Sequence, residues 1–241
     1  MQIVSWTLGR ACVESEIRVI DTIRAYDPDI LILLEIPREA FHRIEDGLST
    51  QSWGHWFSTR STATGMRSLV LSHWPITRRR QARASTARGQ IFRFCVEAPH
   101  LEVVAVAMPR GTSASALRRA AWKEVRKVTE DASAPALVIG TFDLTLSQAR
   151  TRLDGLHDLW SSPNHPSEEI TFRSRSDNAA RVDLALGTAS VRAARFRCEY
   201  DHLGREQLIS SHSLIRLDLD EERIGVSPNS SRGRLHGPGT K

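Results

Sequence analysis

The sequence lacks any apolar segment long enough to cross a membrane as a helix. Among its 241 residues, the strongly apolar run Ile30–Leu34 has only the length of a strand, whereas a membrane helix needs roughly 20 residues. The first residues show neither the basic segment nor the apolar segment of a secretory signal. We therefore expect a cytoplasmic protein with no membrane partner.

Cysteine is also scarce. Cys12, Cys95 and Cys198 are far apart, odd in number and never in a Cys-x-x-Cys spacing. This usage excludes a disulfide framework and a cysteine-rich zinc site. We expect three free thiols.

Lysine is nearly absent, although the chain is basic. Lys and Arg total 33 against 28 acidic residues, and the only lysines are Lys123, Lys127 and Lys241. Arginine suits phosphate because its planar guanidinium forms two parallel hydrogen bonds. An arginine-rich, alanine-rich composition is also typical of a GC-rich genome, so the net charge of +5 favours nucleic acid only weakly.

Apolar and amphipathic segments alternate along the chain, which predicts an α/β domain. A domain over residues 1–222 is expected, followed by a disordered tail over 223–241, because Ser, Gly, Pro and Arg dominate after Glu222. The expected helices are Glu14–Tyr26, Arg38–Gly47 and Ser115–Asp131. The expected strands are Gln2–Trp6, Ile30–Glu35, Trp53–Thr59, Ser68–Ser72, Ile91–Ala98, Leu101–Ala107, Ala136–Ile139, Ile170–Arg173, Val182–Gly187 and Ser213–Leu219.

Polar residues stand where several apolar runs stop. Examples are Thr7, Glu35, Asp143, Asp183 and His212. A single carboxylate at a strand end is common and often structural. Five polar strand ends in one chain indicate a shared cleft at one rim of the sheets.

Six segments, from Ser5-Trp6-Thr7-Leu8 to Ser210-Ser211-His212, follow one another in the order of a known family's motifs. They resemble the endonuclease/exonuclease/phosphatase superfamily of metal-dependent phosphodiesterases. Ser5-Trp6-Thr7-Leu8 resembles its Ser-Trp-Asn-Leu strand, and the segment from Pro28 to Glu35 resembles Pro-Asp-Ile-Leu-x-Leu-Gln-Glu. The other four are Gly65 with Leu69–Ser72 and Pro75-Ile76, Gly140-Thr141-Phe142-Asp143, Thr171-Phe172 with Arg181-Val182-Asp183, and Ser210-Ser211-His212. The resemblance implies a two-sheet α/β sandwich with helices on both outer faces.

Three matching positions keep the family's residue. Glu35 matches the metal-binding glutamate, and one or two carboxylates suffice for Mg²⁺ or Mn²⁺. His212 matches the histidine that contacts the scissile phosphate. Asp183 matches the aspartate that orients this histidine and favours its charged form. The resemblance therefore implies a phosphate-ester ligand and a divalent metal.

Other positions depart from the family. Thr7 stands for an asparagine, Ala107 for a phosphate-contacting histidine, Thr141 for the aspartate proposed to activate water, and Ser211 for an aspartate. A threonine hydroxyl is not basic at neutral pH. Asp143 replaces an asparagine two residues after Thr141 and could act as a substitute base or metal ligand.

Two functions remain open at this stage. One is a divergent metal-dependent hydrolase whose activity is weak, altered or lost. The other is a non-catalytic module that binds a phosphate ligand, nucleic acid or protein. Retention of Glu35, Asp183 and His212 favours the first, and the changes at Ala107, Thr141 and Ser211 favour the second.

Three secondary features have competing interpretations. Asp201-His202 is an alternative Asp-His pair, but Ser211-His212 is favoured because an apolar strand follows it. The arginines 78, 79, 80, 83 and 88 could follow a nucleic-acid backbone, although a solvated loop is the more common explanation. Trp53 and Trp56 could stack on bases, but we expect them to pack in the core.

Overall fold

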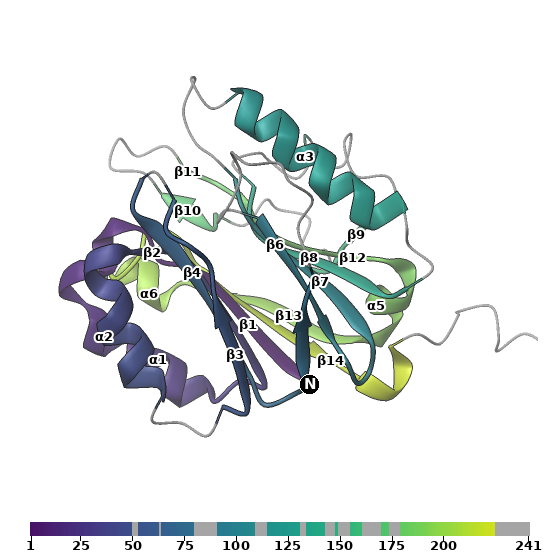
Figure 1. Cartoon of the computed structure of the whole chain (residues 1–241), viewed down its shortest axis with the longest axis horizontal. Helices are drawn as coiled ribbons and strands as arrows, with labels where there is room; N and C mark the ends of the chain where they lie inside the picture. The colour runs from purple at the N-terminus through teal and green to yellow at the C-terminus, as the bar shows by residue number, and fades with distance from the viewer. Residues whose placement is uncertain are drawn as a thin grey trace, which may run out of the picture.

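Two six-stranded sheets pack face to face in the computed structural model of this chain (Figure 1). The structure describes residues 1–49, 53–62, 64–79, 91–108, 115–130, 134–142, 148, 155–160, 170–173 and 179–224. The first sheet has the order β13 (Arg195–Asp201), β14 (Leu214–Leu219), β1 (Gln2–Thr7), β2 (Ile30–Pro37), β4 (Met66–Ser72), β3 (His55–Ser58). The second has the order β5 (Ile76–Arg78), β6 (Ile91–Val96), β7 (Leu101–Ala107), β8 (Ala136–Thr141), β12 (Asp183–Gly187), β9 (His157–Asp158).

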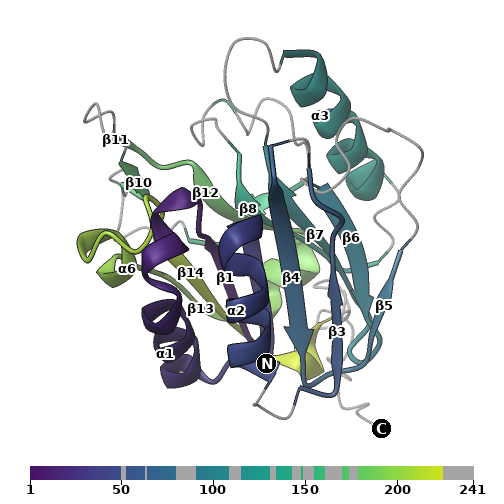
Figure 2. The same ribbon diagram turned by 60° about the vertical axis from the view of Figure 1, so that its left-hand side comes forward.

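Helices cover both outer faces, as Figures 1 and 2 show. α1 (Glu16–Tyr26) and α2 (Arg38–Ser49) cover the first sheet, and α3 (Ser115–Glu130) covers the second. The shorter elements are α5 (Ala189–Ala194), α6 (Leu203–Glu206), the 3₁₀ helices η1 (Arg10–Glu14) and η3 (Glu221–Arg223), and the two-stranded ribbon of β10 (Phe172–Arg173) and β11 (Ala179–Ala180). The predicted sandwich with helices on both outer faces is confirmed.

The alternation of side chains in each strand explains the layers. In β2, Ile32 and Leu34 face the core between the sheets, whereas Leu31 and Leu33 face the helices. Both faces are therefore buried, which is why this strand is a continuous apolar run. On the outer face of the second sheet, Trp122 of α3 packs over the strands.

Parallel pairing brings key strand ends together. β1 runs parallel to β2, and β7 runs parallel to β8. Parallel neighbours need a long crossover, and α1 and α3 lie in these two connections. The carboxyl ends of β1, β2, β7 and β8 therefore lie at one rim of the sandwich. The antiparallel strands β12 and β14 begin at the same rim.

Several boundaries differ from the sequence-based expectation. The first helix begins at Glu16 rather than Glu14, because residues 10–14 form a separate 3₁₀ turn after Gly9, which has a φ of 66°. The strand expected at Trp53–Thr59 is shorter, His55–Ser58. Ile224 is 7% exposed in the core between the sheets. Residues 225–241 of the expected tail lie outside the described residues.

Candidate active site

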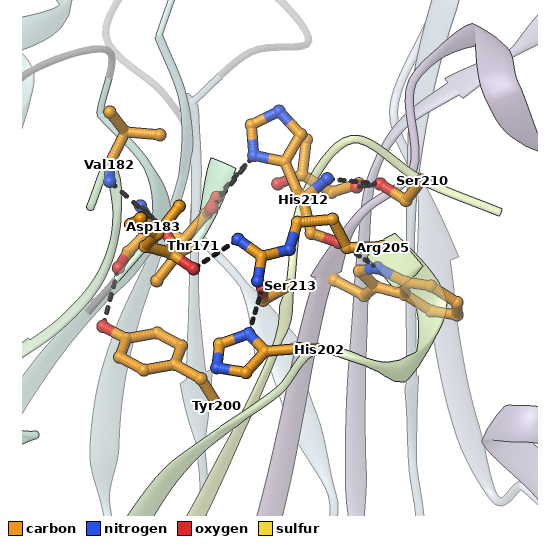
Figure 3. Close-up of polar contacts among 12 residues, drawn as sticks. Thr171, Val182, Asp183, Tyr200, His202, Arg205, Ser210, His212 and Ser213 are labelled. Atoms are coloured by element: carbon orange, nitrogen blue, oxygen red, sulfur yellow. Dashed lines mark hydrogen bonds and ion pairs between the residues drawn. The ribbon is translucent and has the colours of Figure 1, made fainter. Parts of the chain in front are cut away.

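A histidine–aspartate pair lies buried where the two sheets meet. Nδ1 of His212 lies 2.9 Å from both carboxylate oxygens of Asp183 (Figure 3). His212 is 1% exposed and Asp183 is 2% exposed. Because a carboxylate only accepts hydrogen bonds, Nδ1 carries the proton in this pair. The predicted pair is confirmed as a contact.

Backbone hydrogen bonds brace both members of the pair. The Thr171 hydroxyl accepts from the amides of Val182 and Asp183, at 3.1 and 3.0 Å. The Ser210 hydroxyl donates to the carbonyl of Thr7 at 2.6 Å and accepts from the amide of His212 at 2.9 Å. Ser210 therefore links the end of β1 to the backbone of His212 and limits the movement of the histidine.

Aromatic rings hold the histidine on its other sides. The ring of Phe172 lies 4.7 Å from the His212 ring, between their centroids. Trp6 donates from Nε1 to the carbonyl of His212 at 3.2 Å. A Cβ on Gly204 would meet the Trp6 ring at 2.3 Å, so only glycine leaves room for this indole. Sequence reasoning assigned no function to these neighbours, because they position the pair through packing and backbone contacts.

Glu35 occupies a strained position at the end of β2. Its φ is 52°, the left-handed region that non-glycine residues rarely adopt. The pairing of β2 with β4 shifts by one residue between Leu33 and Ile36, so Glu35 lies in a β-bulge. Its carbonyl accepts a hydrogen bond from Gly9 at 3.0 Å. Bulges redirect side chains near functional sites, and strain of this kind gathers there.

Three residues form one row across the second sheet. Ala107 pairs with Thr141, and Thr141 pairs with Asp183. By strand alternation all three face the interior between the sheets, like Ala105, Ile139 and Ala185. Thr141 is 1% exposed, and its hydroxyl oxygen has no hydrogen-bond partner among the described residues. A buried hydroxyl without a hydrogen-bond partner destabilises the fold. Thr141 is such a residue within the described part of the chain.

The remaining substituted positions lie at the same rim. Thr7 ends β1, is 2% exposed and pairs with Leu34. Ser211 precedes His212 and is partly exposed. Asp143, expected as a substitute base or ligand, lies outside the described residues. The structure thus brings Thr7, Ala107, Thr141, Asp183, Ser211 and His212 to one rim, with Glu35 at the end of the strand beside β1.

The described residues contain no group of three or more acidic, histidine or cysteine side chains that could hold a metal ion. Mg²⁺ keeps several waters and uses one or two carboxylates together with substrate phosphates. Glu35 offers one such carboxylate, and the hydroxyl of Thr141 is an unsatisfied oxygen at the same rim. This donor set is compatible with a magnesium or manganese ion that is held partly by substrate.

A buried ion pair lies behind Asp183. Arg181 donates to both carboxylate oxygens of Asp158 at 2.7 Å and to the hydroxyl of Tyr200 at 2.9 Å. Tyr200 in turn donates to the backbone carbonyl of Asp183 at 2.7 Å. Burial acts to lower the pKa of Arg181, but the hydrogen bonds to Asp158 and the nearby negative charge hold that pKa above its ordinary value. Arg181 therefore stays charged, as its stacking over Trp160 at 4.5 Å also favours.

The structure bears on the competing sequence interpretations. His202 contacts Ser213, with Nδ1 at 2.7 Å from the hydroxyl, and Asp201 contacts Tyr26, whereas His212 contacts Asp183 as predicted. Within the basic cluster, Arg79 forms an ion pair with Glu102 at 2.9 Å. Arginines 80, 83 and 88 lie outside the described residues.

The tryptophans and cysteines complete this comparison. Trp56 is 61% exposed, so the expectation that it packs in the core is wrong. It lies on β3, the edge strand of the first sheet. Trp53 is partly buried, stacks on His73 at 4.5 Å and packs against the core beneath α1 and α2. All three cysteines are free, as expected.

The comparisons with known proteins identify the family and the fold. The model of the Endonuclease/Exonuclease/phosphatase family matches residues 8–212, and the chain therefore belongs to that family. No match is found among curated proteins. Within the described residues, no helix is both long and apolar enough to cross a membrane.

Solved structures share the fold at low sequence identity. An AP endonuclease from Archaeoglobus fulgidus has a TM-score of 0.68 and 14% identity, covering 91% of this chain and 99% of that one. Truncated TDP2 from Caenorhabditis elegans has a TM-score of 0.67 and 14% identity, covering 90% and 95%. The 3′ phosphatase NExo from Neisseria, bound to product DNA hairpin, has a TM-score of 0.67 and 16% identity, covering 91% and 99%.

Proposed function

We propose that this chain is a divergent phosphoester-binding member of its family, with hydrolytic activity that is weak, altered or lost. The observation that carries the proposal is the row of Ala107, Thr141 and Asp183. One end of this row keeps the carboxylate that orients His212, while the other two positions hold a methyl group and a neutral hydroxyl. By the resemblance, the site keeps one group for contacting phosphate at His212, lacks a second such group at Ala107, and lacks the group for proton transfer at Thr141.

The retained residues have distinct roles in this proposal. His212, oriented by Asp183, contacts the phosphate through Nε2. Glu35 would hold Mg²⁺ or Mn²⁺, and such an ion supplies charge stabilisation when phosphorus is attacked. Asp143 is proposed as a substitute base or additional metal ligand. We propose a phosphate ester as the ligand, with nucleic acid among the candidates, and retain the expectation of a cytoplasmic location.

A second candidate is a non-catalytic module that binds phosphate ligands, nucleic acid or protein. The buried, unsatisfied hydroxyl of Thr141 and the inert side chain of Ala107 favour it. Each lost acid–base group typically costs about 10² to 10⁴ in rate. Binding needs none of these groups, since His212 and the metal act on the phosphate in the ground state as well.

A turnover assay with metal separates the two candidates. The protein is incubated with plasmid DNA, single-stranded RNA and a generic phosphodiester, with Mg²⁺ and then Mn²⁺. Glu35→Ala and His212→Ala test the site, and Glu199→Gln, an exposed carboxylate on β13, is the matched control. Metal-dependent turnover that both site variants abolish and the control retains supports the hydrolase. A folded protein that binds phosphate esters without turnover supports the module.

A further inference from the structure

A pocket of about 540 Å³ opens directly beside the histidine–aspartate pair. Ser210 and Ser211 line one wall. Ser211 is the neighbour of His212 in sequence, and its carbonyl accepts a hydrogen bond from the amide of Arg173 at 3.1 Å. The pocket and the candidate active site therefore share a wall.

Three arginines from distant parts of the chain line this pocket. They are Arg10 in η1, Arg173 in β10 and Arg205 in α6. Among the described lining residues, Glu14 is the one carboxylate. Figure 2 shows β10 and α6 on the same side of the molecule. The arginines outnumber the carboxylate in this described part of the lining, which favours an anionic ligand.

Two of these guanidinium groups have no carboxylate partner in the described part of the chain. Arg205 donates from Nη1 to the carbonyl of Ile170 at 2.5 Å, which fixes the group in place (Figure 3). Arg10 is exposed. A guanidinium held by a backbone carbonyl keeps its positive charge and its remaining N–H donors available for an anion. Arg205 is therefore an oriented donor rather than half of an internal ion pair.

The substitution at position 211 has a consequence in this pocket. The resembling family motif is Ser-Asp-His, and this chain has Ser210-Ser211-His212. An aspartate at 211 would place a second negative charge in the lining, opposite the arginines. Serine removes that charge and supplies a hydroxyl that can donate to an oxyanion. The serine removes the carboxylate of the family motif and makes the neighbouring pocket more favourable for an anion.

We propose that this pocket is a subsite for a second phosphate group of the ligand, next to the phosphate that His212 contacts. This proposal rests on the proposed function, since it places the first phosphate at His212. The preferred ligand then carries at least two phosphates, either along a nucleic-acid strand or on one small molecule. A simple monophosphate bound at His212 would not contact the arginines of the pocket.

Binding measurements with matched ligands test the subsite. The probes are thymidine 5′-monophosphate, thymidine 3′,5′-bisphosphate and a hexamer of deoxythymidine, measured by calorimetry or fluorescence anisotropy. The variants are Arg205→Gln, Arg205→Lys and Arg173→Gln. Arg197→Gln, an exposed arginine on β13 that pairs with Glu199, is the control for lost charge. Thermal unfolding establishes that each variant is folded.

We expect the bisphosphate to bind at least tenfold more tightly than the monophosphate. Arg205→Gln should weaken bisphosphate binding about tenfold to a hundredfold, the range for a charge-assisted hydrogen bond, and leave monophosphate binding unchanged. Arg205→Lys should lose less, because it keeps the charge. If the hexamer binds as well, each lost arginine should lower the salt slope of its affinity by about one.

His212→Ala separates failure of the subsite from failure of the proposed function. Equal binding of monophosphate and bisphosphate, or equal losses in Arg205→Gln and Arg197→Gln, would overturn the subsite even where His212→Ala weakens monophosphate binding. If the bisphosphate binds through the arginines and its affinity is unchanged in His212→Ala, the placement of the first phosphate at His212 is wrong. Tight binding of the bisphosphate without the hexamer identifies a small-molecule ligand, and binding of both identifies a strand.

Discussion

Thr141 and Ala107 are side by side in the second sheet, at positions where the resemblance implies a group that transfers a proton and a group that contacts phosphate. Restoring the pair as Thr141→Asp with Ala107→His should raise metal-dependent hydrolysis at least tenfold above the parent, since each group typically contributes about 10² to 10⁴. Because position 141 is buried, the new carboxylate should also lower the melting temperature unless Mn²⁺ is present. Initial rates and thermal unfolding, with and without Mn²⁺, measure both effects.

The control for this pair is Thr141→Asn with Ala107→His, which has nearly the same shape and no carboxylate. It restores only the histidine, so its gain in rate should be smaller than that of the Asp variant, and its melting temperature should not depend on the metal. If the Asp variant is folded and its rate equals that of the parent, the missing groups at these two positions are not what limits chemistry at this rim.

Cys12 gives a pH-dependent contribution to stability. Burial, with a smaller effect of Glu16, raises the pKa of its thiol from 9.0 to about 12. The unfolded chain therefore releases this proton near pH 9 while the folded chain retains it, so stability should fall as the pH rises from about 9 toward 12. Urea unfolding across this range should show a smaller decline in Cys12→Ala than in the parent. Equal declines would contradict the assignment to Cys12.

Residue chemistry made part of the site predictable. Glu35, Asp183 and His212 were predicted because several polar strand ends occur in one chain and their order matches a family motif, and the structure brings Asp183 and His212 into contact. Thr171, Ser210 and Tyr200 were not assigned a function, because they act through backbone amides and carbonyls. A hydroxyl that braces a backbone looks like any other hydroxyl in the sequence.

At the level of secondary structure, β8 depends on a glycine just before Thr141. Gly140 has a φ of 133°, and a Cβ there would meet the carbonyl oxygen of Val106 at 2.1 Å. Gly140→Ala should therefore destabilise the fold by about 2 to 4 kcal/mol, combining backbone strain with overpacking. Chemical denaturation at constant pH measures this change.

Gly65 provides the matched control for that substitution. Its φ is 79°, but nothing lies within 4 Å of an added Cβ. Gly65→Ala should lower the free energy of unfolding by about 1 to 2 kcal/mol, through backbone strain alone. Equal losses in the two variants would mean that the close approach of β7 to β8 is not what requires glycine at position 140.

The strands buried on both faces were predicted well, whereas among the edge strands β3 was predicted and β5, β9 and β13 were not. β2 and β7 are recognisable because their apolar runs are continuous. β13 was missed because its charged residues interrupt the pattern and a bulge between Arg195 and Arg197 shifts its alternation, leaving Phe196 79% exposed. Local sequence carries little information about pairing at a bulged, half-solvated edge.

For the molecule as a whole, the pair of Asp158 and Arg181 links the two sheets. Asp158 belongs to β9 of the second sheet, and Tyr200, which also contacts Arg181, belongs to β13 of the first. Asp158→Ala should cost about 3 to 5 kcal/mol, because it leaves a buried guanidinium unpaired. Replacing both partners, as Asp158→Ala with Arg181→Met, should recover part of this loss.

Glu199→Ala is the control for that measurement, since it removes one partner of an exposed pair. Its effect on the free energy of unfolding should stay within about 0.5 kcal/mol. If Asp158→Ala is equally mild, the buried pair does not stabilise the junction between the sheets. If Asp158→Ala is fully folded and binds phosphate more weakly than the parent, the buried ion pair also helps to position Asp183.

The position of β1 between β2 and β14 determines when the site can exist during synthesis. The Ser210 hydroxyl joins Thr7 to His212, which are 205 residues apart in sequence, and β1 pairs with a strand that begins only at Leu214. A nascent chain therefore has an incomplete first sheet and lacks His212 until nearly all of the domain has left the ribosome. Contacts this distant in sequence form slowly. The pair should be assembled among the last events of folding, so we expect the proposed phosphate binding to recover late during refolding.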